Sequence, residues 1–329
     1  MSQNLISTRA AAAILYIIRK FARCKWRLTR RGVFLIGFDL KMRDEFIDRL
    51  CSEYPFLRCG SVGESLCGRE LRALELGPSE NSVLFAATFH GMEWLTSLLV
   101  LVFTKRISDA FYNNSALYGI DVKSALNRRG LMVVPCVNPD GVEISLNGAQ
   151  TAGSYAALVN EILRGGDASR WQANARGVDL NHNFNANWGM LHKLEEARGI
   201  TGPAPTRYGG PFPESEPETK AMVNLCKDVS FRYVVAFHSQ GEEIYWHFGK
   251  NTPTRAENMG KTMAKLSGYK LAEPEGLAVG GGFKDWFIER FSRPGFTVEI
   301  GKGTNPLPLS DIEPIYKRLE KMLVYCCFA

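Results

Sequence analysis

The fold of this 329-residue chain is decided by the stretch SVLFAATFHGME at residues 82–93. Residues 82–89 are almost all apolar, small or β-branched, which predicts a strand buried on both faces of a sheet. His90 and Glu93 follow this strand directly, and the apolar pattern after them predicts a helix over 94–107. An imidazole and a carboxylate with this spacing can bind one cation when a distant residue supplies another ligand. Taken alone, this spacing more often belongs to a turn with a capping carboxylate.

Buried strands and amphipathic helices alternate along the rest of the chain. The apolar patterns predict strands at 70–76, 131–137, 233–237 and 296–300, helices at 42–54, 154–164, 283–291 and 312–324, and turns at 61–65 and 138–141. This alternation predicts one α/β domain with a mixed, largely parallel central β-sheet flanked by helices. Sites in such sheets gather at the carboxyl ends of the strands. His90, Asn138, His238 and Glu299 all fall at predicted strand ends, so we expect them to meet there.

The excess of basic over acidic residues is concentrated at the N-terminus of the chain. The formal net charge is +6, but residues 1–31 carry eight basic and no acidic residues, which leaves 32 basic against 34 acidic residues elsewhere. We therefore separate a basic segment of uncertain structure, residues 1–37, from a main domain, residues 38–329. The nearly neutral main domain predicts no nucleic-acid partner. The nine-residue apolar run at 10–18 is too short to cross a bilayer, so we expect no transmembrane span and at most a weak membrane-surface contact.

The eight cysteines have neither zinc-knuckle spacing nor the regular spacing of a disulfide framework. Several, such as Cys136, lie within apolar patterns, so we expect reduced and mostly buried thiols in a reducing compartment. The N-terminal apolar run also lacks a small-residue cleavage site. These features together predict a cytoplasmic protein, although they leave secretion open.

Two of the five histidines, His90 and His238, end predicted strands that lie far apart in the sequence. Each alone would most simply be a satisfied residue at the edge of the core. Together with Glu93 they form a His₂Glu set, which catalytic zinc hydrolases use while keeping a fourth position open for water. The chain contains no His-Glu-x-x-His motif, which excludes a thermolysin-like arrangement.

The order of five motifs resembles the zinc carboxypeptidase family. These motifs are His90-x-x-Glu93, NPDG at 138–141, GVDLN at 177–181, His238 and TVE at 297–299. The resemblance covers roughly residues 40–329, so 38–329 is identified as a zinc peptidase catalytic domain. The segments WQANARGVDLN at 171–181 and PESEPET at 213–219 resemble the bacterial γ-D-glutamyl-meso-diaminopimelate peptidases, which cleave cell-wall peptides.

The resemblance implies a role for each of these residues. His90, Glu93 and His238 would hold one Zn²⁺ per chain, which polarises the scissile carbonyl and lowers the pKa of water. Glu299 would be the general base that takes the proton of the water and returns it to the leaving amine. Asp179 would orient a ligand imidazole through its second ring nitrogen.

A further donor must stabilise the negative oxygen of the tetrahedral intermediate. The family uses an arginine upstream of the Asp-x-Asn motif, and Arg176 is the nearest in this sequence. The spacing is variable, so Arg170 and Arg164 are alternatives. The resemblance also implies that Asn181 contacts the substrate.

Two departures from the family pattern concern substrate choice. Members that trim free C-termini have an arginine after the motif asparagine, which grips the terminal carboxylate, but this chain has His182. Imidazole cannot form that bidentate pair and is only partly charged at neutral pH. Lys284 stands at the family's specificity position, where it can pair with a carboxylate of diaminopimelate or lie as a plain surface lysine.

The first hypothesis is therefore a zinc metallopeptidase that hydrolyses a γ-D-glutamyl-diaminopimelate amide bond in murein-derived peptides. The alternative is a metallocarboxypeptidase that releases single C-terminal residues from ordinary peptides, against which His182 counts. A non-catalytic binding protein on the same scaffold is less favoured because all three ligands and the base are present. A deacylase or amidase acting on a small molecule shares the zinc set and would be distinguished by the size of its substrate.

Overall fold

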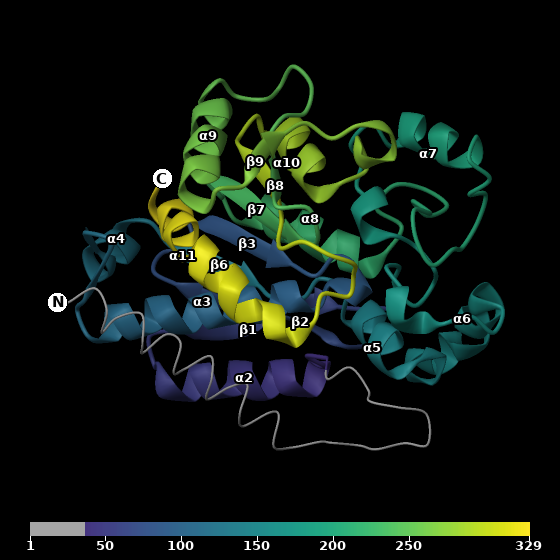
Figure 1. Cartoon of the computed structure of the whole chain (residues 1–329), viewed down its shortest axis with the longest axis horizontal. Coiled ribbons are helices and arrows are strands. Elements are labelled where there is room, and N and C mark those ends of the chain that lie inside the picture. The colour runs from purple at the N-terminus through teal and green to yellow at the C-terminus, as the bar shows by residue number, and fades with distance from the viewer. Residues whose placement is uncertain (1–36) are drawn as a thin grey trace.

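The computed structural model describes residues 37–329. The predicted basic segment and its membrane contact therefore lie outside the described residues, apart from Gly37. The described chain forms one eight-stranded mixed sheet with helices on both faces, as Figure 1 shows. The predicted fold class, a single α/β domain with a mixed central sheet, is confirmed.

The central part of the sheet is parallel. In spatial order the strands are β1 (Arg58–Glu64), β2 (Glu70–Leu76), β6 (Leu131–Val134), β3 (Val83–Ala87), β7 (Tyr233–His238), β10 (Gly295–Glu299), β8 (Glu243–Tyr245) and β9 (Lys270–Ala272). β6, β3, β7 and β10 run parallel to one another, whereas β1, β2 and β8 pair in antiparallel fashion with their inner neighbours. Because parallel strands end at the same edge, the residues that follow these four strands come together.

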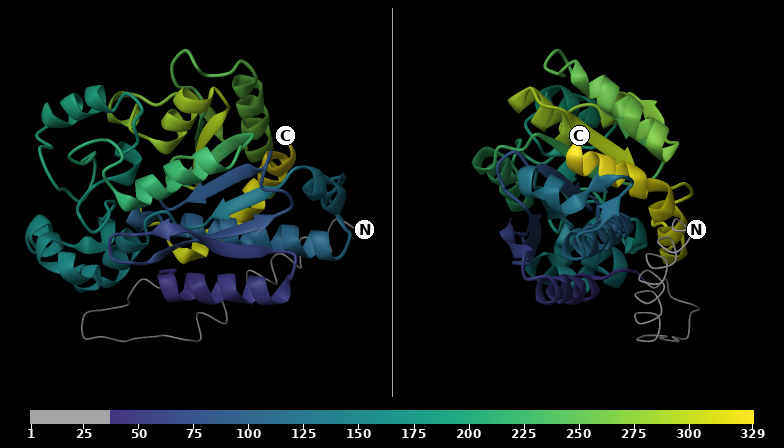
Figure 2. Two further views of the ribbon diagram at one scale, coloured as in Figure 1. Left: turned by 180° about the vertical axis from the view of Figure 1, so that it is seen from behind. Right: turned by 90° about the vertical axis from the view of Figure 1, so that its left-hand side faces the viewer.

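β3 lies in the middle of the sheet and is buried on both faces. Val83, Phe85 and Ala87 belong to a core that is completed by α2, α3, α9 and α11. Leu84 and Ala86 belong to a second core with α8 and α10. Figure 1 views the face that α11 crosses, and the left view of Figure 2 shows α8 on the opposite face. The continuous apolar run of the sequence therefore reflects burial on both sides.

The helices are distributed over both faces and the site edge. They are α2 (Leu40–Glu53), α3 (Leu95–Tyr112), α4 (Val122–Arg128), α5 (Pro139–Asn147), α6 (Ala156–Leu163), α7 (Trp188–Glu196), α8 (Pro217–Asp228), α9 (Arg255–Ser267), α10 (Phe283–Phe291) and α11 (Ile312–Phe328). A separate hairpin pairs β4 (Ala116–Leu117) with β5 (Ile120–Asp121). None of the helices in the described part of the chain is both long and apolar enough to cross a membrane.

Two predicted turns are wrong. Residues 61–65 mostly belong to strand β1, which pairs with β2 through a bulge, so edge pairing overrides the turn signal of the sequence. The NPDG motif begins helix α5: the side chain of Asn138 accepts a hydrogen bond from the amide of Gly141 (2.8 Å), and Pro139 occupies the first helical position. Both features are typical of helix N-termini.

The prediction of reduced thiols is wrong for one pair of cysteines. Cys51 in α2 and Cys59 in β1 form a disulfide, because the ends of these two elements bring their Cα atoms within 6.3 Å. The other described cysteines are free, and they are Cys67, Cys136, Cys226, Cys326 and Cys327. All of these except Cys67 are buried, as expected for structural thiols.

Candidate active site

The turn after β3 carries two of the predicted metal ligands. Thr88 takes a positive φ of 57°, and His90 then leads into the short 3-10 helix η1 (Gly91–Glu93). At Gly91 an added Cβ would lie 2.2 Å from the carbonyl oxygen of Gly141 in α5. Only glycine therefore allows this turn to pack against the start of the helix.

The side chain of Asn138 connects this turn by hydrogen bonds to the loop at residues 172–173. Its side-chain amide donates to the carbonyl oxygens of Phe89 (3.0 Å), Gln172 (2.9 Å) and Ala173 (3.1 Å). The amide of Gly91 donates to the same carbonyl of Gln172 at 3.0 Å. The loop at residues 172–173 is therefore held directly beside the candidate ligands.

His90, Glu93 and His238 converge as predicted. The Glu93 carboxylate lies 2.9 Å from Nδ1 of His90 and 3.1 Å from Nδ1 of His238, and one donor atom from each residue lies within 4.8 Å of the others. Burial raises the pKa of Glu93, but the facing His90 and His238 lower it to about 2, so this side chain is a carboxylate. Two imidazole nitrogens and a carboxylate oxygen are the donor set of catalytic zinc, and these residues fit one zinc ion.

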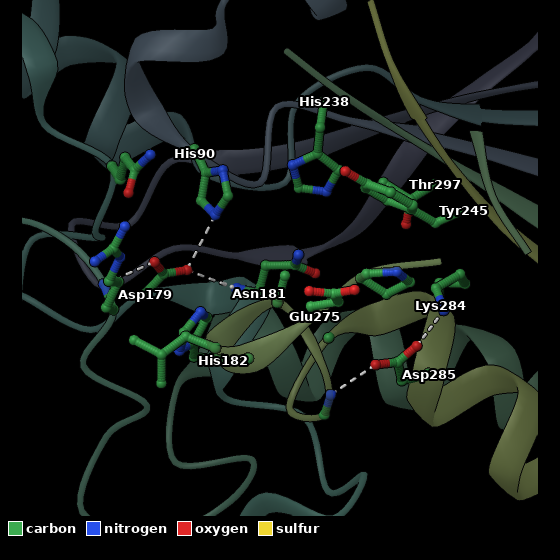
Figure 3. Close-up of a pocket in the computed structure, with 18 of the residues that line it drawn as sticks. His90, Asp179, Asn181, His182, His238, Tyr245, Glu275, Lys284, Asp285 and Thr297 are labelled. Atoms are coloured by element: carbon green, nitrogen blue, oxygen red, sulfur yellow. Dashed lines mark hydrogen bonds and ion pairs between the residues drawn. The ribbon is translucent and has the colours of Figure 1, made fainter. Parts of the chain in front are cut away.

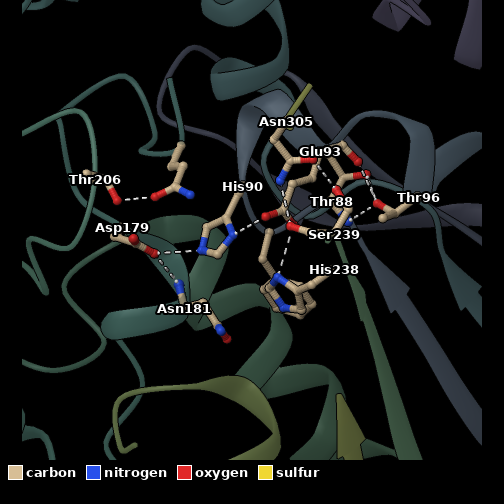
Figure 4. A network of polar contacts seen from close by, with 12 residues as sticks. Thr88, His90, Glu93, Thr96, Asp179, Asn181, Thr206, His238, Ser239 and Asn305 are labelled. Carbon is tan, nitrogen blue, oxygen red and sulfur yellow. Dashed lines mark hydrogen bonds and ion pairs between the residues drawn. The ribbon is translucent and has the colours of Figure 1, made fainter. Parts of the chain in front are cut away.

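Asp179 lies behind His90, where the resemblance placed it. Its Oδ1 is 3.1 Å from Nε2 of His90, and its Oδ2 accepts the backbone amide of Arg207 at 2.9 Å. Burial would raise the pKa of Asp179, but His90 and His182 hold it well below its ordinary value. An ionised carboxylate can only accept, so Nε2 of His90 carries a proton, and Nδ1, which faces Glu93, is the nitrogen that would bind a metal. Figure 4 shows this arrangement.

Glu299 ends β10 directly beside His238, with which it pairs in the parallel register. Both residues line a cavity of about 560 Å³, shown in Figure 3, together with His90 and Asp179. Burial and then the negative charge of Glu93 raise the pKa of Glu299 well above its ordinary value. The predicted base therefore faces the same space as the candidate metal ligands.

His182 lines the cavity, but a buried glutamate holds it. Its Nδ1 lies 2.7 Å from Oε1 of Glu195, a fully buried residue of α7. The other oxygen of this carboxylate, Oε2, lies 3.2 Å from Nδ1 of His192. Because Nδ1 of His182 faces Glu195, Nε2 is the nitrogen of this ring that is left for a ligand.

Asn181, next to His182, lines the cavity as well, and its Oδ1 accepts a hydrogen bond from the amide of Phe283 at 3.1 Å.

Lys284 also lines the cavity, and it is only 5% exposed rather than a surface residue. Its ammonium pairs with the Asp285 carboxylate and donates to the carbonyl oxygen of His247 at 2.8 Å. The other carboxylate oxygen of Asp285 accepts the amide of Gly280 at 2.8 Å. This wall of the cavity therefore carries both a positive and a negative group, as Figure 3 shows.

Arg176 is not brought to this cavity. Its guanidinium lies 3.4 Å from the fully buried carboxylate of Glu216 and over the ring of Tyr155. Of the two alternatives, Arg170 lines a neighbouring cavity, and Arg164 is the left-handed residue that ends α6. None of the three lines the cavity that contains His90 and Glu299.

The cavity wall includes functional groups that the sequence did not single out. Those with polar or charged side chains are Gln172, Arg198, Arg207, Tyr245, Glu275 and Asp285. Gln172 lies within the segment 171–181 that the sequence analysis singled out, and Asp285 directly follows Lys284, but neither was given a role there. The others come from loops and strand β8, whose sequences have no motif.

Known proteins resemble this chain over most of its length. The family model described as zinc carboxypeptidase matches residues 44–321 of this chain. The chain is similar to gamma-D-glutamyl-L-diamino acid endopeptidase 1 of Lysinibacillus sphaericus, with 36% identity over 299 residues that span 90% of this chain and 72% of that protein.

Two solved structures share the fold. Bovine thrombin-activatable fibrinolysis inhibitor, in complex with tick carboxypeptidase inhibitor, superimposes with a TM-score of 0.68 at 19% identity, over 88% of this chain and 96% of that one. Murein-tripeptide amidase MpaA from Escherichia coli O157 has a TM-score of 0.52 at 23% identity, over 82% of this chain and 92% of that one.

Proposed function

Because the chain belongs to the zinc carboxypeptidase family of metallopeptidases, we propose that it hydrolyses the amide bond between a γ-D-glutamyl group and diaminopimelate in murein-derived peptides. The observation that carries this proposal is the convergence of His90, Glu93 and His238, with His90 and His238 lining one cavity together with Glu299 and several charged residues. The relative from Lysinibacillus sphaericus is a gamma-D-glutamyl-L-diamino acid endopeptidase. This likeness supports a γ-D-glutamyl bond over an ordinary peptide bond.

The catalytic chemistry is divided between the metal ligands and Glu299. A zinc ion held by His90, Glu93 and His238 would polarise the scissile carbonyl and lower the pKa of water. Glu299 takes a proton from the attacking water and passes it to the leaving amine. Asp179 keeps the His90 ring in one tautomer and one orientation through its 3.1 Å contact.

Gln172 is better placed than Arg176 to stabilise the negative oxygen of the tetrahedral intermediate. It lines the cavity, and its backbone is fixed to the ligand turn by Gly91 and Asn138. The oxygen of its carboxamide accepts from the hydroxyl of Thr206, so its amide N–H groups point away from Thr206 and remain for the substrate. A preorganised neutral donor of this kind is one that oxyanion sites use.

The walls of the cavity match a leaving group that carries charges of both signs. Lys284 and Asp285 lie side by side, and Arg198 and Glu275 line the same cavity. The side chain of diaminopimelate ends in an ammonium and a carboxylate. His182 in place of an arginine disfavours a purely C-terminal preference, because imidazole cannot form the bidentate pair.

The test is digestion of L-Ala-γ-D-Glu-diaminopimelate beside a panel of α-linked L-peptides, followed by mass spectrometry. We expect diaminopimelate to be released only from the γ-linked substrate, with loss of activity in chelator and its recovery on addition of Zn²⁺. Glu299→Gln, with its zinc content measured, is the inactive control. Release of single C-terminal residues from the L-peptides would instead establish the carboxypeptidase alternative.

A further inference from the structure

A second cavity of about 450 Å³ adjoins the catalytic one. The two share Gln172 and Arg207 as lining residues. In Figure 4, Thr206, which lines only the second cavity, lies on the far side of Asp179 from His90. In Figure 3, Lys284 lies on the opposite side of the catalytic cavity from Asp179. The candidate metal site therefore lies between the second cavity and the wall that holds Lys284.

The second cavity has an apolar part and a charged part that holds two arginines and one carboxylate. Its apolar lining is made by Met92, Ile162, Leu163, Trp171 and Pro205. Its charged groups are Arg170, Arg207 and Asp167, and the carboxylate of Asp167 accepts hydrogen bonds from the amide and the hydroxyl of Ser169. Met92 belongs to the ligand turn itself, and its amide donates to the carbonyl of Trp171 at 2.9 Å. The cavity is therefore built onto the same turn that holds His90 and Glu93.

Arg207 is the charged residue at the boundary of the two cavities. It takes a positive φ of 66°, which is unfavourable for a side chain with a Cβ, and its amide donates to Asp179. Within residues 37–329 its guanidinium has no ion pair and no hydrogen bond, in contrast to Arg176, which pairs with Glu216. The backbone of Arg207 is thus fixed to the support of the metal site while its charge remains free for a ligand.

A cation at such a place is complementary to a γ-linked glutamyl group. In a γ-linked glutamyl group the free α-carboxylate lies on the acyl side, separated from the scissile carbonyl by two methylenes and the α-carbon. An α-linked residue without an acidic side chain has no carboxylate there. A guanidinium beside the metal site, on the side opposite the leaving group, can pair with this carboxylate through a charge-assisted fork.

We propose that the second cavity binds the acyl side of the substrate and that Arg207 recognises the free α-carboxylate of the γ-linked glutamyl group. The apolar part of the cavity then receives the residue that precedes the glutamyl group, which is alanyl in the proposed substrate. This inference rests on the proposed function and names Arg207 as the residue that selects the γ-linkage.

The experiment compares two substrates that differ by one charge. They are L-Ala-γ-D-Glu-diaminopimelate and its D-isoglutaminyl analogue, in which the α-carboxylate is a carboxamide. Each is assayed with the wild type, Arg207→Gln, Arg207→Lys and the matched control Arg290→Gln, which removes an exposed arginine of α10. kcat and KM are measured separately.

We expect the wild type to prefer the carboxylate substrate by about 10- to 100-fold in kcat/KM, the range of one charge-assisted contact. Arg207→Gln loses this preference to within about threefold, chiefly through a rise in KM for the carboxylate substrate. Arg207→Lys keeps an intermediate preference because it retains the charge without the fork. Arg290→Gln behaves as the wild type.

Other outcomes separate this inference from the proposed function. An equal loss of kcat on both substrates in Arg207→Gln would assign Arg207 to the reacting oxygen and overturn the inference. Equal wild-type cleavage of both substrates, or a preference that survives Arg207→Gln, would overturn it while the proposed function stands. Failure of the zinc-loaded wild type to cleave either substrate would overturn the proposed function itself.

Discussion

Nε2 of His90 lies 3.1 Å from Oδ1 of Asp179, so the side chain that presents a nitrogen to the metal is oriented by a buried carboxylate. The second oxygen of the same carboxylate accepts the amide of Arg207 at 2.9 Å. One side chain therefore positions both a metal ligand and the residue that we assign to substrate recognition.

Asp179→Asn is expected to weaken zinc binding by about 10- to 100-fold, the usual effect of losing the partner of a ligand histidine. An amide no longer enforces the tautomer of His90, because it can donate as well as accept. Competition with a chromophoric chelator measures the affinity. An unchanged zinc affinity would show that Asp179 does not orient His90.

Glu299→Gln is expected to lower kcat by about 10²- to 10⁴-fold, since the amide cannot take the proton of the attacking water. Zinc content should remain near one per chain, because Glu299 is not among the converging ligands. The exposed Glu289 of α10 offers a matched control, and Glu289→Gln should retain wild-type activity. Substantial activity in Glu299→Gln would exclude it as the base.

Gln172→Ala is expected to lower kcat by about 10²- to 10³-fold, the cost of removing one oxyanion donor. Arg176→Ala should keep kcat within about threefold, because its guanidinium is paired with Glu216 outside the cavity. Steady-state kinetics on the γ-D-glutamyl substrate distinguishes the two. The reverse ranking would return the oxyanion role to Arg176.

Glu218 gives the fold a dependence on pH that is separate from catalysis. Burial, and then the negative charge of Asp140, raise the pKa of Glu218 from 4.5 to about 8. The folded chain thus binds the proton more tightly than the unfolded chain, so this group's contribution to stability is complete below about pH 4.5 and is lost as the pH rises towards 8.

The substitution Glu218→Gln replaces the carboxyl group with an amide that does not ionise, so the variant should not lose stability in this way as the pH rises. Its Tm should exceed that of the wild type at pH 8, and the difference should shrink as the pH falls towards 5. Thermal unfolding at several pH values measures this, with the exposed Glu64 changed to glutamine as the control. A difference that does not vary with pH would contradict the assignment.

Lys284→Met is expected to destabilise the fold by about 3–5 kcal/mol, because it leaves the buried carboxylate of Asp285 without its cation. The double variant with Asp285→Asn should recover part of this loss, since neither charge then remains. Urea unfolding of the two variants tests the pairing. A single variant as stable as the wild type would show that Lys284 and Asp285 are not coupled.

Local sequence by itself determined the central strands and the position of the candidate ligand and base residues at their ends. The apolar run at 82–89 is buried on both faces, and His90, His238 and Glu299 follow or end parallel strands as predicted. These features depend on the periodicity of side chains over a few residues and on the rule that parallel strands share one carboxyl edge. Such information is contained in short stretches of the chain.

Only the tertiary structure decided which loop side chains reach the cavity. Arg176 is turned away because Glu216, 40 residues later, needs a cation in its buried position, whereas Arg207 is brought in by Asp179. Glu195 holds His182 from a helix that the sequence pattern did not predict. Loop side chains take their direction from distant partners rather than from local periodicity, so their roles appear only when those partners are placed.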